Sequence, residues 1–453
     1  MKKLLLFLLL LLILLLIYYF KCCKPTAPIV YKHRPNEFII SYCDGNTSSR
    51  QATRQFMKQK GFSLIQTCAC EENLELYRDS VSLAPDGDDA KIREKPAGSD
   101  VIRNFIVTDN WSEKEQLDTI KKLSNDQIQV LFGSAHAPNL HALDSVILAV
   151  DDSGVNTGDI RLATGGVNKI PYLYKNKSGV VFCDGTTPEG VWGMNILRLS
   201  GQSTSSEPQD EDGHGTFIGN IIAGYAIPQN YISADQNINI KQLHVKFIKK
   251  RNDEGDLFTA MCGIHYAIKK GAKIINASWR VRTSNSDQEK DVRNAFCPTF
   301  KALKDSNVLL IAAAGNDTMN LDGNGKAWPA AFAKPVPNTP DFSDNIISVG
   351  SWASDSGRIA FHSNYGSFVN VYAPGLNVQS VGLDNKARVG LGTSYAAPFV
   401  ARTAAILRGL HRTILAKSIK DFIIKSSSPA AGSTVPLLNV STITANHSTQ
   451  LTQ

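Results

Sequence analysis

Three strand-length segments dominated by apolar residues most constrain the fold of this chain. They are residues 146–150, 273–279 and 307–316. Segments of this kind are typical of strands buried on both faces of a parallel sheet. A helix-like stretch from Leu257 to Ile268, with its apolar residues on one stripe, precedes the second segment. Because strands alternate with helices, we predict an α/β fold with a mostly parallel central sheet and helices on both faces.

Polar residues stand at the C-terminal ends of two of these segments. Asp151 and Asp152 end the first, and Asn316 ends the third. The carboxyl ends of parallel strands are where α/β sheets place their sites. Of the two aspartates we choose Asp152, because strand alternation directs Asp151 to the opposite face. The alternative for both Asp152 and Asn316 is a turn, where these residue types are common.

A histidine and a serine complete the set. His214 stands between Gly213 and Gly215, so its ring can be approached from several sides, and histidine is the usual base for activating a serine. Ser394 opens an apolar helical segment that continues through residues 399–410. Unpaired N–H groups and the helix dipole would stabilise an anionic intermediate there, although serine also caps helices routinely. Pro398 is expected to fall in the first turn, which has no N–H bond to lose.

From about residue 146 to about residue 409 the chain resembles the subtilisin-like serine protease family, whose catalytic residues come in the order Asp, His, Ser. The motifs that carry the resemblance are Asp152-Ser153-Gly154, Gly213-His214-Gly215-Thr216, Ala314-Gly315-Asn316 and Gly392-Thr393-Ser394-x-Ala396-x-Pro398. The resemblance implies a serine endopeptidase with Ser394 as nucleophile, His214 as general base and acid, and Asp152 as orienting acid. It also implies that Asn316 donates to the oxyanion.

The same resemblance implies an extended polypeptide substrate, bound by strand addition rather than through one side chain. The residues expected to flank it are Ser278, Trp279, Arg280, Ala313, Ala314 and Gly315. Arg280 stands where the family often has glycine, so it is expected to narrow the cleft or to select acidic substrates. The chemistry requires no cofactor; the family commonly binds structural calcium, whose ligands the sequence does not locate. The alternative is a catalytically silent peptide-binding protein on the same fold.

Residues 4–20 are uninterruptedly apolar, with lysines on both sides. Such a run is at the short end of what spans a bilayer. We interpret residues 1–24 as a signal anchor or signal peptide, with the catalytic domain membrane-anchored or secreted, outside the cytoplasm. The formal net charge of +7 is not gathered in one basic block, so nucleic acid is not an expected partner.

The remaining boundaries follow from composition. Residues 25–133 are predicted to form a small α+β domain, which is either a spacer or a folding assistant or inhibitor. The family resemblance favours the second interpretation, a propeptide. The catalytic domain is placed at 134–425, and a Ser/Thr-rich tail at 426–453. None of the spacings of the eight cysteines is typical of a zinc site, and the sequence leaves their redox state open.

Overall fold

A computed structural model describes the chain between residues 33 and 440, with internal gaps. The described residues are 33–43, 47–79, 99–107, 145–159, 162–163, 172–199, 201–227, 239–249, 255–323, 325–335, 341–383, 387–429 and 435–440. The apolar run at residues 4–20 lies outside them, as do residues 441–453 of the predicted tail. Within the described ranges, no helix has the length and apolar character needed to cross a membrane.

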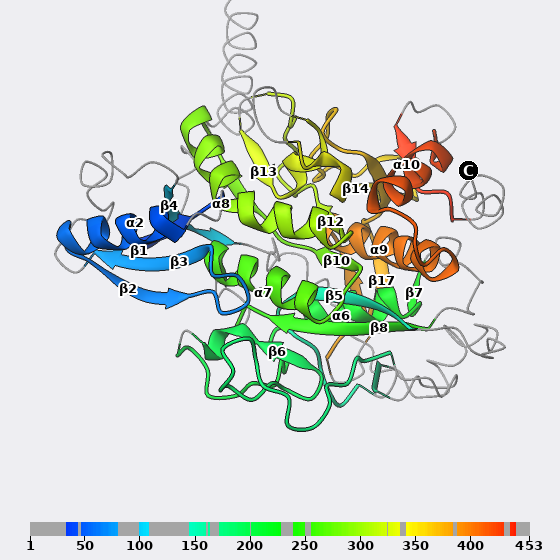
Figure 1. Cartoon of the computed structure of the whole chain (residues 1–453). Coiled ribbons are helices and arrows are strands. Elements are labelled where there is room, and N and C mark those ends of the chain that lie inside the picture. The colour runs from blue at the N-terminus through cyan, green and yellow to red at the C-terminus, as the bar shows by residue number, and fades with distance from the viewer. Residues whose placement is uncertain are drawn as a thin grey trace, which may run out of the picture. The chain divides into compact units, whose positions relative to one another are not determined.

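A ten-stranded sheet forms the centre of the protein (Figure 1). Seven strands run parallel to their neighbours in the order β20-β16-β14-β12-β10-β5-β8, and β6 continues the parallel edge. Only β15 and β19 pair in the antiparallel sense. The strands are β5 (Val146–Asp152), β6 (Gly193–Asn195), β8 (Ile240–Lys246), β10 (Ile274–Ala277), β12 (Leu309–Ala313), β14 (Ile346–Ala353), β15 (Arg358–Ile359), β16 (Val371–Pro374), β19 (Ser428–Pro429) and β20 (Pro436–Leu437).

Helices cover both faces of this sheet. They are α6 (His214–Ile222), α7 (Leu257–Lys269), α8 (Ser286–Asp305), α9 (Thr393–Leu410) and α10 (Ala416–Ser426). Alternate residues of one strand belong to different cores: Leu309 and Ile311 pack with α6, α9 and α10, whereas Leu310 packs with α7 and α8. This period of two is the physical reason why the strands are apolar throughout. The mostly parallel sheet with helices on both faces is confirmed.

Several smaller elements lie outside the central sheet and its covering helices. They are β7 (Ala226–Ile227), β17 (Val378–Val381) and β18 (Ala387–Gly390) in one sheet, β11 (Val281–Thr283) paired with β13 (Lys326–Trp328), and the 3-10 turns at Ile196–Arg198, Ala330–Ala333 and Ser343–Asn345.

A second sheet is built from the N-terminal residues. It contains β1 (His33–Ser41), β2 (Phe62–Thr67), β3 (Leu74–Asp79) and β4 (Asp100–Val107), and helix α2 (Thr47–Gln59) lies between β1 and β2 in the chain. We call these five elements the N-terminal module. Successive residues of its strands point to opposite faces, as in the central sheet. Phe38 and Ile40 pack in a small core with Met57 of α2, whereas Ile39 belongs to the core that contains α7 and α8. The module is therefore apolar on both faces.

Candidate active site

Asp152 and His214 meet at the carboxyl end of β5. The carboxylate oxygen Oδ1 of Asp152 lies 2.8 Å from Nδ1 of His214, the first residue of α6. Both side chains are fully buried. The Ser153 N–H also donates to Oδ1 of Asp152 at 2.7 Å. A carboxylate held in this way orients the ring and keeps Nε2 as the nitrogen available for proton exchange.

A buried carboxylate that sequence reasoning missed connects the aspartate loop to the histidine helix. Oδ1 of Asp210 accepts from Ser153 Oγ at 3.0 Å, and Oδ2 accepts from the Thr216 N–H at 2.9 Å. The same Oδ1 also accepts from the Gly213 N–H at 2.9 Å, just before α6 begins. A negative charge at a helix N-terminus is favourable for that helix. Asp210 therefore positions His214 against Asp152; its place a few residues before a Gly-His-Gly sequence was the available signal.

Ser394 is the second residue of α9, close to the histidine. The ring of its neighbour Tyr395 contacts the His214 ring edge-on, with centroids 5.6 Å apart. Ser394 Oγ donates to the Ser278 carbonyl at 3.1 Å. Ser278 lies directly after β10, so the serine stands at the carboxyl ends of β5 and β10.

The expectation for Pro398 is corrected. Helix α9 begins at Thr393, so Pro398 is its sixth residue and removes the N–H that would bind the Ser394 carbonyl. Ser278 Oγ donates to that carbonyl instead, at 2.8 Å. The proline is tolerated because a side chain from the neighbouring strand replaces the lost hydrogen bond, and this bond also ties the serine to the sheet.

Asn316 approaches the start of the same helix from the end of β12. Its Oδ1 accepts from the N–H of Thr393 at 2.7 Å and from the Thr393 hydroxyl at 2.9 Å. Two donors on one side require the amide oxygen there, so the NH₂ group faces the other way. A Cβ on Gly392, whose φ is +153°, would lie 2.9 Å from Nδ2 of Asn316. Gly392 therefore allows the amide to lie directly against the turn that carries Ser394.

Asp151 lies on the opposite side of the sheet from Asp152, as alternation predicts. Its Oδ2 accepts from Trp279 Nε1 at 3.2 Å, and its Oδ1 is so close to α7 that a Cβ on Gly263 would be 2.3 Å away. Burial, reinforced by the nearby charge of Asp152, raises the pKa of Asp151 well above its usual value. Burial therefore favours the protonated, uncharged form of Asp151.

The predicted substrate-flanking residues lie beside the site, but several of their side-chain or backbone groups already bind other groups of the protein. Trp279 is buried and binds Asp151, and Asn364 Nδ2 donates to the Ala314 carbonyl at 2.8 Å. Arg280 forms an ion pair with Asp317 at 2.7 Å and is only 7% exposed. Asp317 also pairs with Arg282 at 3.0 Å, so one carboxylate is shared by two cations, and this cluster holds the Arg280 side chain within the protein.

Three buried histidines outside the candidate triad make the fold sensitive to acid. Burial lowers the pKa of His244 and of His362 to about 4, and that of His265 to about 3. Each folded-state pKa lies below the unfolded value, so the stability present near pH 7 is lost as the pH falls from about 6.5 toward 4. The slope is about 1.4 kcal/mol per pH unit for each histidine at most. We expect urea midpoints to fall over this range, and to fall less steeply in His244→Gln. An unchanged slope in that variant contradicts this account.

No metal centre is evident in the part of the chain that the structure describes, where no three His, Cys, Asp or Glu side chains are placed to hold an ion. These side chains therefore do not locate a site for the structural calcium that the family commonly binds.

Comparisons with known proteins show the family to which this chain belongs. The model of the subtilase family matches residues 144–446, two thirds of the chain. Subtilisin DY of Bacillus licheniformis is 26% identical over 223 residues, which are 49% of this chain and 72% of that protein. A thermostable alkaline protease of Halalkalibacterium halodurans is 28% identical over 238 residues, covering 52% of this chain and 58% of that protein. The chain belongs to the subtilase family.

A solved structure extends the likeness of the fold. The epidermin leader peptide processing serine protease of Staphylococcus aureus superposes with a TM-score of 0.59 at 17% identity, covering 92% of this chain and 99% of that one. The matched residues are 92% of this chain, more than residues 144–446 can supply, so the structural likeness continues into residues before 144. The N-terminal module thus has a counterpart in the fold of a relative.

Proposed function

We propose that this protein is a serine endopeptidase that works through an acyl-enzyme. Ser394 Oγ attacks the substrate carbonyl and breaks its C–O double bond, while Nε2 of His214 takes the hydroxyl proton. The tetrahedral intermediate then collapses, the C–N bond breaks, and His214 returns the proton to the leaving amine. Water repeats the sequence to release the acid. The observation that carries this proposal is the buried 2.8 Å contact between Asp152 and His214, beside the start of the helix that holds Ser394.

Asp152 and Asn316 stabilise the charges that develop during this reaction. The Asp152 carboxylate stabilises the imidazolium of His214. The NH₂ group of Asn316 and the backbone N–H of Ser394 are suited to donate to the oxyanion, at a helix N-terminus whose dipole favours negative charge. The substrate adds as a strand between residues 278–280 and 313–315, which requires an extended chain more than a particular side chain.

The test is covalent labelling of the full chain with a fluorophosphonate. The adduct is expected on Ser394, located by peptide mass spectrometry, both in freshly purified protein and after incubation to constant mass. Absence of an adduct in both samples, with the fold intact by circular dichroism, supports the alternative of a catalytically silent peptide-binding protein.

A second variant tests the oxyanion donor. Asn316→Ala is expected to lower kcat by about 10²- to 10³-fold and to leave KM nearly unchanged, because the hydrogen bond strengthens only in the transition state. Asn316 also accepts from Thr393, so thermal unfolding of the variant is measured in parallel. A fall in kcat that matches the fraction of unfolded protein contradicts the catalytic role.

Location and regulation complete the proposal. Disulfides form and persist in oxidising compartments, so the three in this structure support placement of the catalytic domain outside the cytoplasm. We further propose that residues 1–24 direct the chain there as a signal anchor or signal peptide. In this proposal residues 25–133 act as an inhibitory domain on the same chain.

A further inference from the structure

All three disulfides connect the turns that join elements of the N-terminal module to the part of the chain that matches the subtilase family. The pairs are Cys43–Cys297, Cys68–Cys262 and Cys70–Cys183, with Cα atoms 5.4, 5.7 and 5.0 Å apart. These separations lie within the range usual for disulfides. Among the described residues, no disulfide lies within the module itself. The two parts are therefore cross-linked at three places along their boundary.

The non-covalent boundary resembles the interior of one domain. Strand β4 of the module pairs in the antiparallel sense with β9 (Gly255–Asp256), and Val107 is the partner of Gly255. At the start of α7 the N–H of Phe258 donates to Asn104 Oδ1 at 3.2 Å. One face of the module then packs into the core that contains α7 and α8. The module's fully or nearly fully buried residues in that core are Ile39, Leu74, Leu76, Ile102, Phe105 and Val107.

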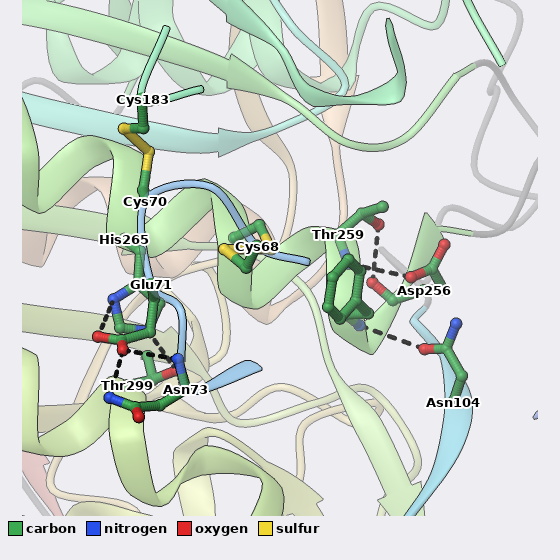
Figure 2. Close-up of a disulfide and its surroundings, with 12 residues drawn as sticks. Cys68, Cys70, Glu71, Asn73, Asn104, Cys183, Asp256, Thr259, His265 and Thr299 are labelled. Carbon is green, nitrogen blue, oxygen red and sulfur yellow. Dashed lines mark hydrogen bonds and ion pairs between the residues drawn. A yellow bond between two sulfur atoms is a disulfide. The ribbon is translucent and has the colours of Figure 1, made fainter. Parts of the chain in front are cut away.

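Polar contacts surround this apolar face. Ser41 Oγ donates to the Asn294 carbonyl at 2.8 Å, and the Asn294 side chain donates to Asp100 at 3.0 Å. In Figure 2 the His265 ring lies between Thr299, at 3.0 Å, and Glu71 of the module, at 3.5 Å. The pKa of His265 is about 3, so the ring is neutral at pH 7 and its contact with Glu71 is a dipolar one.

We propose that the N-terminal module is a permanent, disulfide-held part of the protein. A cut in the chain between residues 107 and 145 leaves the two parts joined, and they separate only after reduction. Any one of the three disulfides is sufficient, and exchange of partners between Cys68 and Cys70 would still link the two parts. Loss of the module would also expose its apolar face to water, which is unfavourable.

This retention has a consequence that rests on the proposed function. A non-covalent inhibitory domain is lost by dilution once the chain is cut. A tethered domain stays at an effective concentration in the mM range, on the order of what short linkers provide. Substrate would then have to compete with the module rather than wait for its release.

The experiment uses the full chain carrying Ser394→Ala, so that its outcome does not depend on protease activity. Cys22→Ser and Cys23→Ser are added to remove the other two cysteines, and a recognition sequence for a site-specific protease is inserted after Gly133. The protein is produced in an oxidising compartment, cut, and run on a denaturing gel. Without thiol we expect one species with the mass of both fragments; with thiol we expect two.

Controls assign the effect to the named cysteines. The triple variant Cys43→Ser, Cys68→Ser, Cys70→Ser is expected to separate without thiol, whereas variants that keep any single pair are expected to stay joined. Peptide mapping under non-reducing conditions should find cross-links between the module and residues 183, 262 and 297. Separation of the cut parent protein without thiol, or disulfides formed within one fragment only, overturns the proposal. A failure of Ser394 labelling in the unmodified chain leaves this result unaffected.

Discussion

Ser394→Ala is expected to lower kcat by about 10⁶-fold, the effect known for the corresponding serine of subtilisin. The substitution removes the only atom that forms the covalent bond to the substrate, and alanine fits where the small hydroxyl was. Binding of an extended peptide should change little, because the backbones at residues 278–280 and 313–315 are untouched. The measurements are single-turnover peptide hydrolysis and fluorophosphonate labelling, both of which should be lost.

A matched serine keeps this result interpretable. Ser356 lies in an exposed turn, so Ser356→Ala should retain full labelling and turnover. The Ser394 hydroxyl donates to the Ser278 carbonyl at 3.1 Å, and a neutral hydrogen bond of this kind contributes about 1 kcal/mol, so a large loss of stability is not expected in Ser394→Ala. Hydrolysis at the parent rate in a folded Ser394→Ala protein would refute the nucleophile assignment.

The second prediction with a large expected effect distinguishes the roles of the two adjacent carboxylates, Asp152 and Asp151. Asp152→Asn is expected to lower kcat by on the order of 10⁴-fold, because an amide cannot stabilise the imidazolium and favours the wrong tautomer of His214. The loss should be read from kcat at several pH values, since a merely structural defect would reduce the amount of active enzyme equally at every pH.

Asp151→Asn is the internal control for that experiment. Burial raises the pKa of Asp151 and so favours its uncharged form, and an amide oxygen can still accept from Trp279. We expect activity within a few-fold of the parent. The folded-state pKa is raised, so the stability that depends on the protonated form is lost as the pH rises from the unfolded value through the folded one. The variant should lack this loss of stability with rising pH, and a large loss of activity in Asp151→Asn alone would reverse the assignment.

Much of the site was predictable because parallel sheets place functional groups by rule. Strand alternation placed Asp151 and Asp152 on opposite faces, and the apolar runs predicted β5, β10 and β12 to within a few residues. These inferences are local: they depend on periodicity and on residues adjacent in the chain. Asp210 and the bond from Ser278 to the Ser394 carbonyl were missed, because each joins segments that are distant in sequence.

The sequence by itself determined the central architecture, the order of the candidate triad and its place at the carboxyl ends of the strands. Only the tertiary structure decided that Arg280 and Arg282 share Asp317, that Ser278 replaces the hydrogen bond lost at Pro398, and that the N-terminal module shares a core with α7 and α8. Cysteine spacing along the chain carries no information on which pairs meet. The three disulfides depend on Cα separations of 5.0 to 5.7 Å between residues more than a hundred positions apart, and such distances exist only once the chain is folded.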